Sequence, residues 1–188
     1  QQRDMMTSVF KSQIPAMEKS DFLVMFEPVG ATAQPIVITQ NEFMRRMKDM
    51  AAIQSGMAFY GELPDSYNLI VNTDHPLSQK VIADTESACK SELTPILDEL
   101  KTVNEEIERL QEAKKDKKDD EIPVADKEAL KHAEEKAKEL RAKESDILKT
   151  YADRTPLVRQ LVDLALLSNN MLKGEALSKF IKRSVEML

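Results

Sequence analysis

The sequence is short of several residue types, and each shortage excludes a class of protein. A single cysteine, Cys89, rules out an internal disulfide framework and fits a reducing compartment. Only four glycines occur in 188 residues, which argues against glycine-rich phosphate loops and against all-β folds with many tight turns. No apolar run is long enough to cross a bilayer, so we expect no membrane contact.

An excess of positive charge is also missing. The chain has 27 Lys and Arg against 33 Asp and Glu, a formal net charge of −6, so no nucleic-acid partner is expected. It begins Gln1-Gln2 and shows no signal-peptide pattern, from which we expect a fragment of a longer, cytoplasmic protein. The length suffices for one domain with a real core.

The first third of the sequence alternates between helix and strand patterns. The patterns predict a weak helix at 5–19, strands at 21–29 and 35–39, a helix at 41–54 and a strand at 67–71. Short apolar runs bounded by Pro and Gly are typical of strands. We therefore expect a small three-stranded sheet.

The second half is helical. From Leu93 to Leu110 the apolar residues are spaced 3, 4, 3, 4, 3, and a second such seam runs from Leu130 to Tyr151, with Glu144 at one seam position. The charged break at 114–124 separates the two arms, which predicts an antiparallel helical hairpin at about 88–150. Two short apolar helices are predicted at 156–168 and 174–187. Together this is an α+β fold, a single domain over 1–188 with a coiled-coil-like hairpin insertion and a C-terminal helix pair.

Few residues could carry catalysis or bind a metal ion. His75 follows Asp74, but adjacent residues rarely supply acid–base geometry, and before Pro76 a helix-capping role is the better interpretation. We expect His132 to be solvated and Cys89 to pack between helices. Two distant histidines and one cysteine cannot complete a tetrahedral metal site.

The C-terminal helix pair is too apolar to be buried against a small sheet alone. We expect the two helices to form a four-helix bundle with those of a second copy, giving a homodimer. An ordinary intramolecular core is the alternative. The residues assigned to the dimer interface are Leu157, Leu161, Leu164, Ala165, Leu167, Leu177, Phe180, Ile181, Val185 and Leu188.

A methionine stripe marks the predicted helix at 41–54. Core packing would explain it, but methionine is flexible and suits a surface that accepts many partners. We expect the methionines to be at least partly exposed, with Phe43 or Ile53 tethering the helix to the sheet. The residues assigned to this patch are Phe43, Met44, Met47, Met50, Met57, Phe59 and Tyr60.

Three segments resemble the C-terminal domain of the heat-shock protein 90 chaperones, most closely that of bacterial members. They are TDHPL (73–77), MRRMKDM (44–50) and LVRQLVDLALLSNNMLKGEALSKFIKRSVEML (157–188). The resemblance covers about 9–86 and 152–188. It implies constitutive homodimerisation through the last two helices, and contact of unfolded or partly folded client proteins with the methionine patch.

The resemblance also limits what this chain does. The family binds ATP and Mg²⁺ in a separate N-terminal domain whose motifs are absent here, so we expect a non-enzymatic chain without a cofactor. The hairpin at about 88–150 has no counterpart in the family pattern. The chain ends Glu186-Met187-Leu188 rather than in a Glu-Glu-Val-Asp tail, so tetratricopeptide co-chaperones are not implied.

Two other functions stay open from the sequence. In the first, the chain is a stand-alone coiled-coil adaptor in which the hairpin is the working element. In the second, it is a small enzyme that uses Asp74 and His75.

Overall fold

The computed structural model describes residues 2–53, 61, 63–115 and 123–187. The chain divides into two compact units. One contains Gln1–Thr85 and Tyr151–Leu188 and is called here the sheet unit; the other is Glu86–Thr150, called the hairpin unit. The bounds of the hairpin unit agree closely with those of the insertion predicted at about 88–150.

Six helices and three strands are present in the described residues, and the α+β class is confirmed. The elements are α1 (Gln2–Ser12), β1 (Ser20–Glu27), β2 (Ile36–Gln40), α2 (Glu42–Ile53), β3 (Asp65–Asn72), α4 (Pro76–Glu112), α5 (Val124–Arg154), α6 (Pro156–Ser168) and α7 (Gly174–Glu186). Most boundaries lie within one or two residues of the predicted ones. The exception is α1, which ends before Pro15 rather than continuing to 19.

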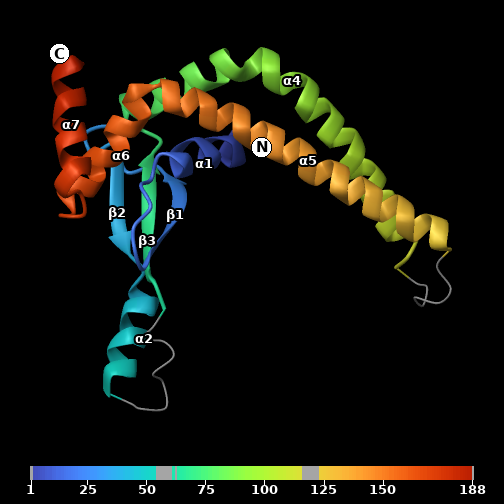
Figure 1. Ribbon diagram of the computed structural model, residues 1–188, viewed down its shortest axis with the longest axis horizontal. Coiled ribbons are helices and arrows are strands. Elements are labelled where there is room, and N and C mark those ends of the chain that lie inside the picture. Colours follow the sequence, from blue (N-terminus) through green and yellow to red (C-terminus); the bar gives the residue numbers. More distant parts are fainter. Residues whose placement is uncertain (1, 54–60, 62, 116–122, 188) are drawn as a thin grey trace. The chain divides into compact units, whose positions relative to one another are not determined.

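The three strands form one mixed sheet in the order β1-β3-β2 (Figure 1). β3 lies in the centre, parallel to β1 and antiparallel to β2. Its residue Leu69 pairs with Val24 and Ile38, and all three are buried. Because these three neighbouring side chains point to the same side of the sheet, that face is the covered one.

Helices α1 and α6 cover that buried face. α1 contacts β1, α6 contacts β2, and the two helices contact each other. The rings of Phe10 on α1 and Phe26 on β1 meet edge to face, with centroids 6.2 Å apart. Each of these amphipathic helices packs its buried apolar stripe against the sheet. The two helices and the sheet together form the core of the sheet unit.

Asn72, at the end of β3, holds the connection between β1 and β2. Its side chain is fully buried. Its Oδ1 accepts hydrogen bonds from the backbone N–H groups of Val29 (3.0 Å) and Asp74 (3.1 Å). Its Nδ2 donates to the carbonyl oxygens of Gly30 (2.8 Å) and Gln34 (3.2 Å). One side chain thus satisfies three backbone groups of this connection and one in the turn after β3.

In the hairpin unit, α4 and α5 pack against each other along the predicted seams. Leu100 and Val103 of α4 form a buried cluster with Ala133, Ala137 and Leu140 of α5. The second seam differs from the prediction at its end, because Leu148 is fully buried whereas the predicted Ile147 is half-buried. A helix of 3.6 residues per turn drifts from a strict heptad, so the neighbouring position turns inward.

An ion pair also joins the two helices. The Lys136 Nζ lies 2.7 Å from the Glu99 Oε1. The hydrogen bond from Lys136 lowers the pKa of Glu99, and the same bond raises the pKa of Lys136. Both side chains are about half exposed, so water screens the pair.

Candidate interaction surfaces

Helix α2 begins directly at the end of β2, on the edge of the sheet. The backbone N–H of Asn41 donates to the carbonyl of Ser66 on β3 (2.9 Å), and its Oδ1 accepts a hydrogen bond from the N–H of Met44 (3.2 Å). Asn41 is therefore the N-cap of α2. In Figure 1, α2 lies beyond the end of the strands, away from α6.

No side chain within Glu42–Ile53 is buried. Met44 and Met47 are half-buried and Met50 is exposed, in agreement with the prediction of partly exposed methionines. The predicted tether is wrong, because Phe43 and Ile53 are 67% and 85% exposed.

A polar contact joins α2 to the sheet instead of the predicted apolar tether. The Lys48 Nζ lies 2.7 Å from the Asp65 Oδ1 at the start of β3. This leaves the apolar side chains of α2 on its surface, which we call the α2 patch: Phe43, Met44, Met47, Met50 and Ile53. The predicted members Met57, Phe59 and Tyr60 lie outside the described residues.

Helix α6 has apolar side chains on two sides. Its inner side is part of the core of the sheet unit and consists of Val158, Leu161, Val162, Ala165 and Leu166. Leu161 and Ala165 were assigned to the dimer interface from the sequence, but as core residues they are not available to a partner. Leu164 is exposed on the outer side, with Leu157 and Leu167 half-buried.

Helix α7 has no fully buried residue between Gly174 and Glu186. Ile181 and Val185 are 54% and 67% exposed, and Leu177 and Phe180 are half-buried. The predicted interface residue Leu188 lies outside the described residues. We call the outward apolar side chains of the two helices the C-terminal apolar surface: Leu157, Leu164, Leu167, Leu177, Phe180, Ile181 and Val185.

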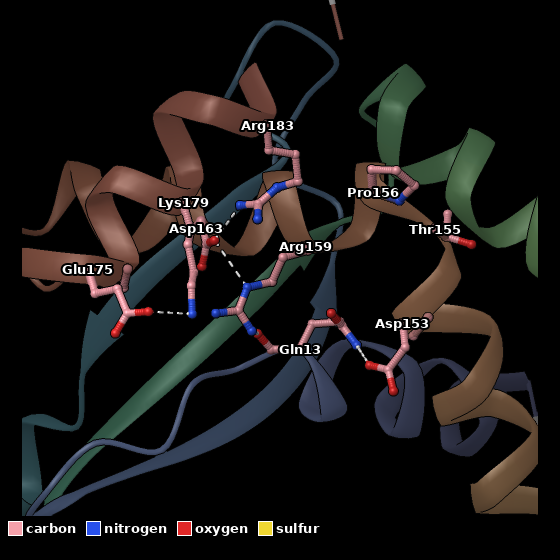
Figure 2. A pocket seen from close by; sticks show the side chains of 11 residues that line it. Gln13, Asp153, Thr155, Pro156, Arg159, Asp163, Glu175, Lys179 and Arg183 are labelled. Carbon is pink, nitrogen blue, oxygen red and sulfur yellow. Dashed lines mark hydrogen bonds and ion pairs between the residues drawn. The ribbon is translucent and has the colours of Figure 1, made fainter. Parts of the chain in front are cut away.

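A buried carboxylate lies between α6 and α7 (Figure 2). Asp163 on α6 is 1% exposed. Its Oδ2 accepts hydrogen bonds from the Nε of Arg159, one turn earlier on α6 (3.0 Å), and from the Nη2 of Arg183 on α7. Its Oδ1 accepts no hydrogen bond from the described part of the chain. A buried carboxylate is costly without such partners.

Gln160 continues this network. The Nε of Arg183 donates to the Oε1 of Gln160 at 2.9 Å, and the Nε2 of Gln160 donates to the Oγ of Ser184. On the other side, the Nη1 of Arg159 donates to the carbonyl of Gln13, after α1, at 2.7 Å. Sequence reasoning missed these roles, since Asp163 and Arg159 look there like ordinary polar positions of an apolar helix.

A pocket of about 810 Å³ opens beside this network. Figure 2 shows the side chains that line it. Three cations (Arg159, Lys179, Arg183) and three carboxylates (Asp153, Asp163, Glu175) surround it. Charges of both signs are thus balanced around the pocket and largely paired, as in the bond from Lys179 Nζ to Glu175 Oε1 at 2.8 Å.

The residues considered for catalysis have structural roles. The Nδ1 of His75 accepts a hydrogen bond from the backbone N–H of Leu77 (3.1 Å), so His75 caps α4 as predicted. The Oδ2 of Asp74 accepts a hydrogen bond from the N–H of Gly30 (3.0 Å) instead of orienting His75.

The other reactive groups offer no site either. Cys89 is buried, and this burial, together with the charge of Glu92, raises the pKa of its thiol. His132 is exposed. Among the described residues, no three His, Cys, Asp or Glu side chains are placed to hold a metal ion, and no helix has the length and apolarity to cross a membrane.

The whole chain is similar to proteins named Chaperone protein HtpG. It is 47% identical over 188 residues to that of Bacteroides thetaiotaomicron and 47% identical over 186 residues to that of Bacteroides fragilis. It is 44% identical over 187 residues to that of Porphyromonas gingivalis. No family model matches the chain, and no solved structure matches it significantly.

These alignments cover 99–100% of this chain but only 27–28% of the relatives. The chain therefore spans little more than a quarter of the curated relatives it matches. The alignment to the first relative includes the hairpin region, so the expectation that the hairpin has no counterpart is wrong for these proteins.

Proposed function

We propose that this chain, which belongs to the heat-shock protein 90 family as a region corresponding to the C-terminal part of HtpG, joins two copies of a cytoplasmic chaperone and contacts its clients. The observation that carries the proposal is that the side chains of the C-terminal apolar surface are exposed or half-buried, and no other element among the described residues of the sheet unit buries them.

Self-association would bury this surface. Each exposed apolar side chain that leaves water contributes about 25 cal/mol per Å² of apolar area. A stable interface needs about 800 Å² from each partner, and two helices from each copy are the economical source in a four-helix bundle. A two-fold axis presents the same surface from both copies and closes the assembly at two.

The first experiment changes Ile181 and Val185 together to Asp. Both side chains are exposed, so the protomer should remain folded, while two charges in an apolar interface should give monomers. Analytical ultracentrifugation over a concentration series measures the outcome.

The matched control changes Lys179 and Lys182 together to Gln. These exposed residues lie on the charged side of α7, and the substitution shifts the net charge by the same two units. The control should dimerise like the parent chain. A parent chain that is monomeric at tens of micromolar would contradict the proposal.

We further propose that the α2 patch contacts unfolded or partly folded clients. Its methionines are flexible and partly exposed, and such side chains adapt to partners of different shape. In a dimer two such patches are present. A client that reaches both binds more tightly, because the second contact forms at a high effective concentration.

Changing Met44, Met47 and Met50 to Ser tests this role. Client binding should weaken while the free energy of unfolding changes little, because a residue that is not buried contributes only a fraction of the ~2–5 kcal/mol of a buried methionine truncation. The measurement is binding of a chemically unfolded protein by fluorescence anisotropy.

The control changes Arg45, Arg46 and Asp49, which are exposed on the same helix, to Ser. It should bind clients nearly as well as the parent chain. A methionine variant that unfolds would assign the stripe to the core, and one that binds as the parent does would remove the client role.

ATP and Mg²⁺ belong to the proposed function only through the longer parent protein. The described residues hold no cluster fit for a metal ion and no glycine-rich phosphate loop, so no step of ATP turnover is assigned to them. Tetratricopeptide co-chaperones are not part of the proposal.

A further inference from the structure

Helix α7 is attached to the sheet unit in a different way from α1 and α6. Those two helices bury apolar stripes, whereas α7 has no buried side chain between Gly174 and Glu186. Among the described residues, its hydrogen bonds to other elements go to α6 and involve the side chains of Arg183 and Ser184. The apolar side chains of α7 are at most half-buried, so these directional polar bonds add to their packing in defining how α7 is rotated about its axis.

The carboxylate that accepts the bond from the Nη2 of Arg183 is also held from its own helix. Asp163 is buried on α6, between the core residue Val162 and the exposed Leu164. Arg159 holds its Oδ2 from the same helix and is itself held by the carbonyl of Gln13. The carboxylate is thus in place independently of α7, and only Arg183 comes from the other helix. Directional bonds from a guanidinium group to a fixed carboxylate admit few orientations of the helix that carries it.

This geometry turns the apolar side of α7 outward. Each residue of an α-helix is rotated by about 100° from the previous one. Ile181 and Val185 are two residues before and after Arg183, so both are rotated by about 200° from it. When Arg183 faces Asp163, these two side chains therefore face away from α6, as their exposure shows.

We propose that Arg183 and Asp163 are positioning residues for self-association: their ion pair sets the rotation of α7 so that Ile181 and Val185 meet a second copy of the chain. The inference rests on the proposed self-association. It adds which residues orient the apolar side chains of α7 toward the second copy. Arg183 itself lies outside the C-terminal apolar surface, so its effect on the dimer is indirect.

The central experiment compares Arg183→Met with Lys179→Met. Both substitutions remove one positive charge from α7 and leave an unbranched apolar side chain. Within the described part of the chain, Lys179 pairs with Glu175 on its own helix, so its loss leaves the bond between α6 and α7 intact. The dimer dissociation constant, measured by sedimentation, should rise by about tenfold or more for Arg183→Met and by less than about twofold for Lys179→Met.

A second measurement separates positioning from general stability. In the monomeric variant with Ile181→Asp and Val185→Asp, amide hydrogen exchange should show protected N–H groups in α7. Adding Arg183→Met should remove this protection while the exchange of β3 stays unchanged. Where Arg183→Met fails to fold, Arg183→Lys keeps the charge but loses the planar fork, and it should weaken the dimer to an intermediate degree.

The outcomes are distinct for the two proposals. A parent chain that is monomeric contradicts the proposed function. A parent chain that dimerises, with Arg183→Met and Lys179→Met equally tight, overturns the positioning role alone. So does an α7 that is unprotected in the monomer even when Arg183 is present.

Discussion

Two buried polar side chains anchor parts of the sheet unit. Asn72 bonds backbone groups of four residues in the connections before and after the strands, and Asp163 accepts hydrogen bonds from two arginines between α6 and α7. Both side chains are buried, and an unpaired polar group is costly at a buried position. Removing either side chain should therefore lower the free energy of unfolding.

At this scale we predict the effect of Asn72→Ala. The substitution leaves up to four backbone groups without their partner, so the free energy of unfolding should fall by about 2–4 kcal/mol. The control is Asn68→Ala, the same chemical change on the same strand at a half-buried position, which should cost less than about 1 kcal/mol. Urea unfolding measures both, and equal losses would refute the anchoring role.

The helices and strands differ in what stabilises them. α1 and α6 are held by the core, α2 by its cap and the pair of Lys48 with Asp65, and α7 by half-buried side chains together with the bonds of Arg183. The hairpin unit has an apolar cluster of its own between α4 and α5. Elements that bury little are the ones whose surfaces are open to partners.

At the scale of elements we predict that the hairpin can be removed. Deleting about 92–148 and joining the ends with a short linker should leave the sheet unit folded, because the buried residues of that unit, including Val81 of α4 and Ala152 of α5, lie outside the deleted segment. Hydrogen exchange of β3 measures whether the sheet unit stays folded, and sedimentation measures whether the shortened chain still self-associates.

A point substitution provides the control for this deletion. Ala137→Asp places a charge in the hairpin cluster and should melt the hairpin while β3 stays protected. Loss of cooperative unfolding of the sheet unit in either variant would show that the hairpin is needed for its core.

For the whole molecule, the proposed self-association would couple folding to protein concentration. A unit with exposed apolar side chains on its helices is stabilised by a partner that covers them, and a second copy would do so by mass action. Under this proposal, folding and assembly form one equilibrium at micromolar concentrations.

At this scale we predict that the melting temperature of the parent chain rises with protein concentration. The variant with Ile181→Asp and Val185→Asp should melt lower and at a temperature independent of concentration, because its unfolding is unimolecular. Scanning calorimetry at concentrations a hundredfold apart tests this. A parent chain whose melting temperature does not change would contradict coupled dimerisation.

The sequence by itself determined the elements of this protein. Strand and helix boundaries follow from local periodicity, so β1, β2, β3 and α6 could be predicted to within a few residues. The heptad seams likewise predicted which residues of α4 and α5 meet. The segments TDHPL and LVRQLVDLALLSNNMLKG…VEML were enough to indicate the family to which the comparisons also lead.

Only the tertiary structure decided which apolar residues are buried in the core and which are exposed. Leu161, Ala165 and Leu164 look alike in the sequence, but the first two meet the sheet unit's core and the third is exposed. Phe43 or Ile53 was expected to tether α2, but both are exposed, whereas Lys48 contacts the sheet through Asp65. Periodicity places residues on a face of a helix; which face is covered depends on segments far away in the chain, and these come together only when the protein folds.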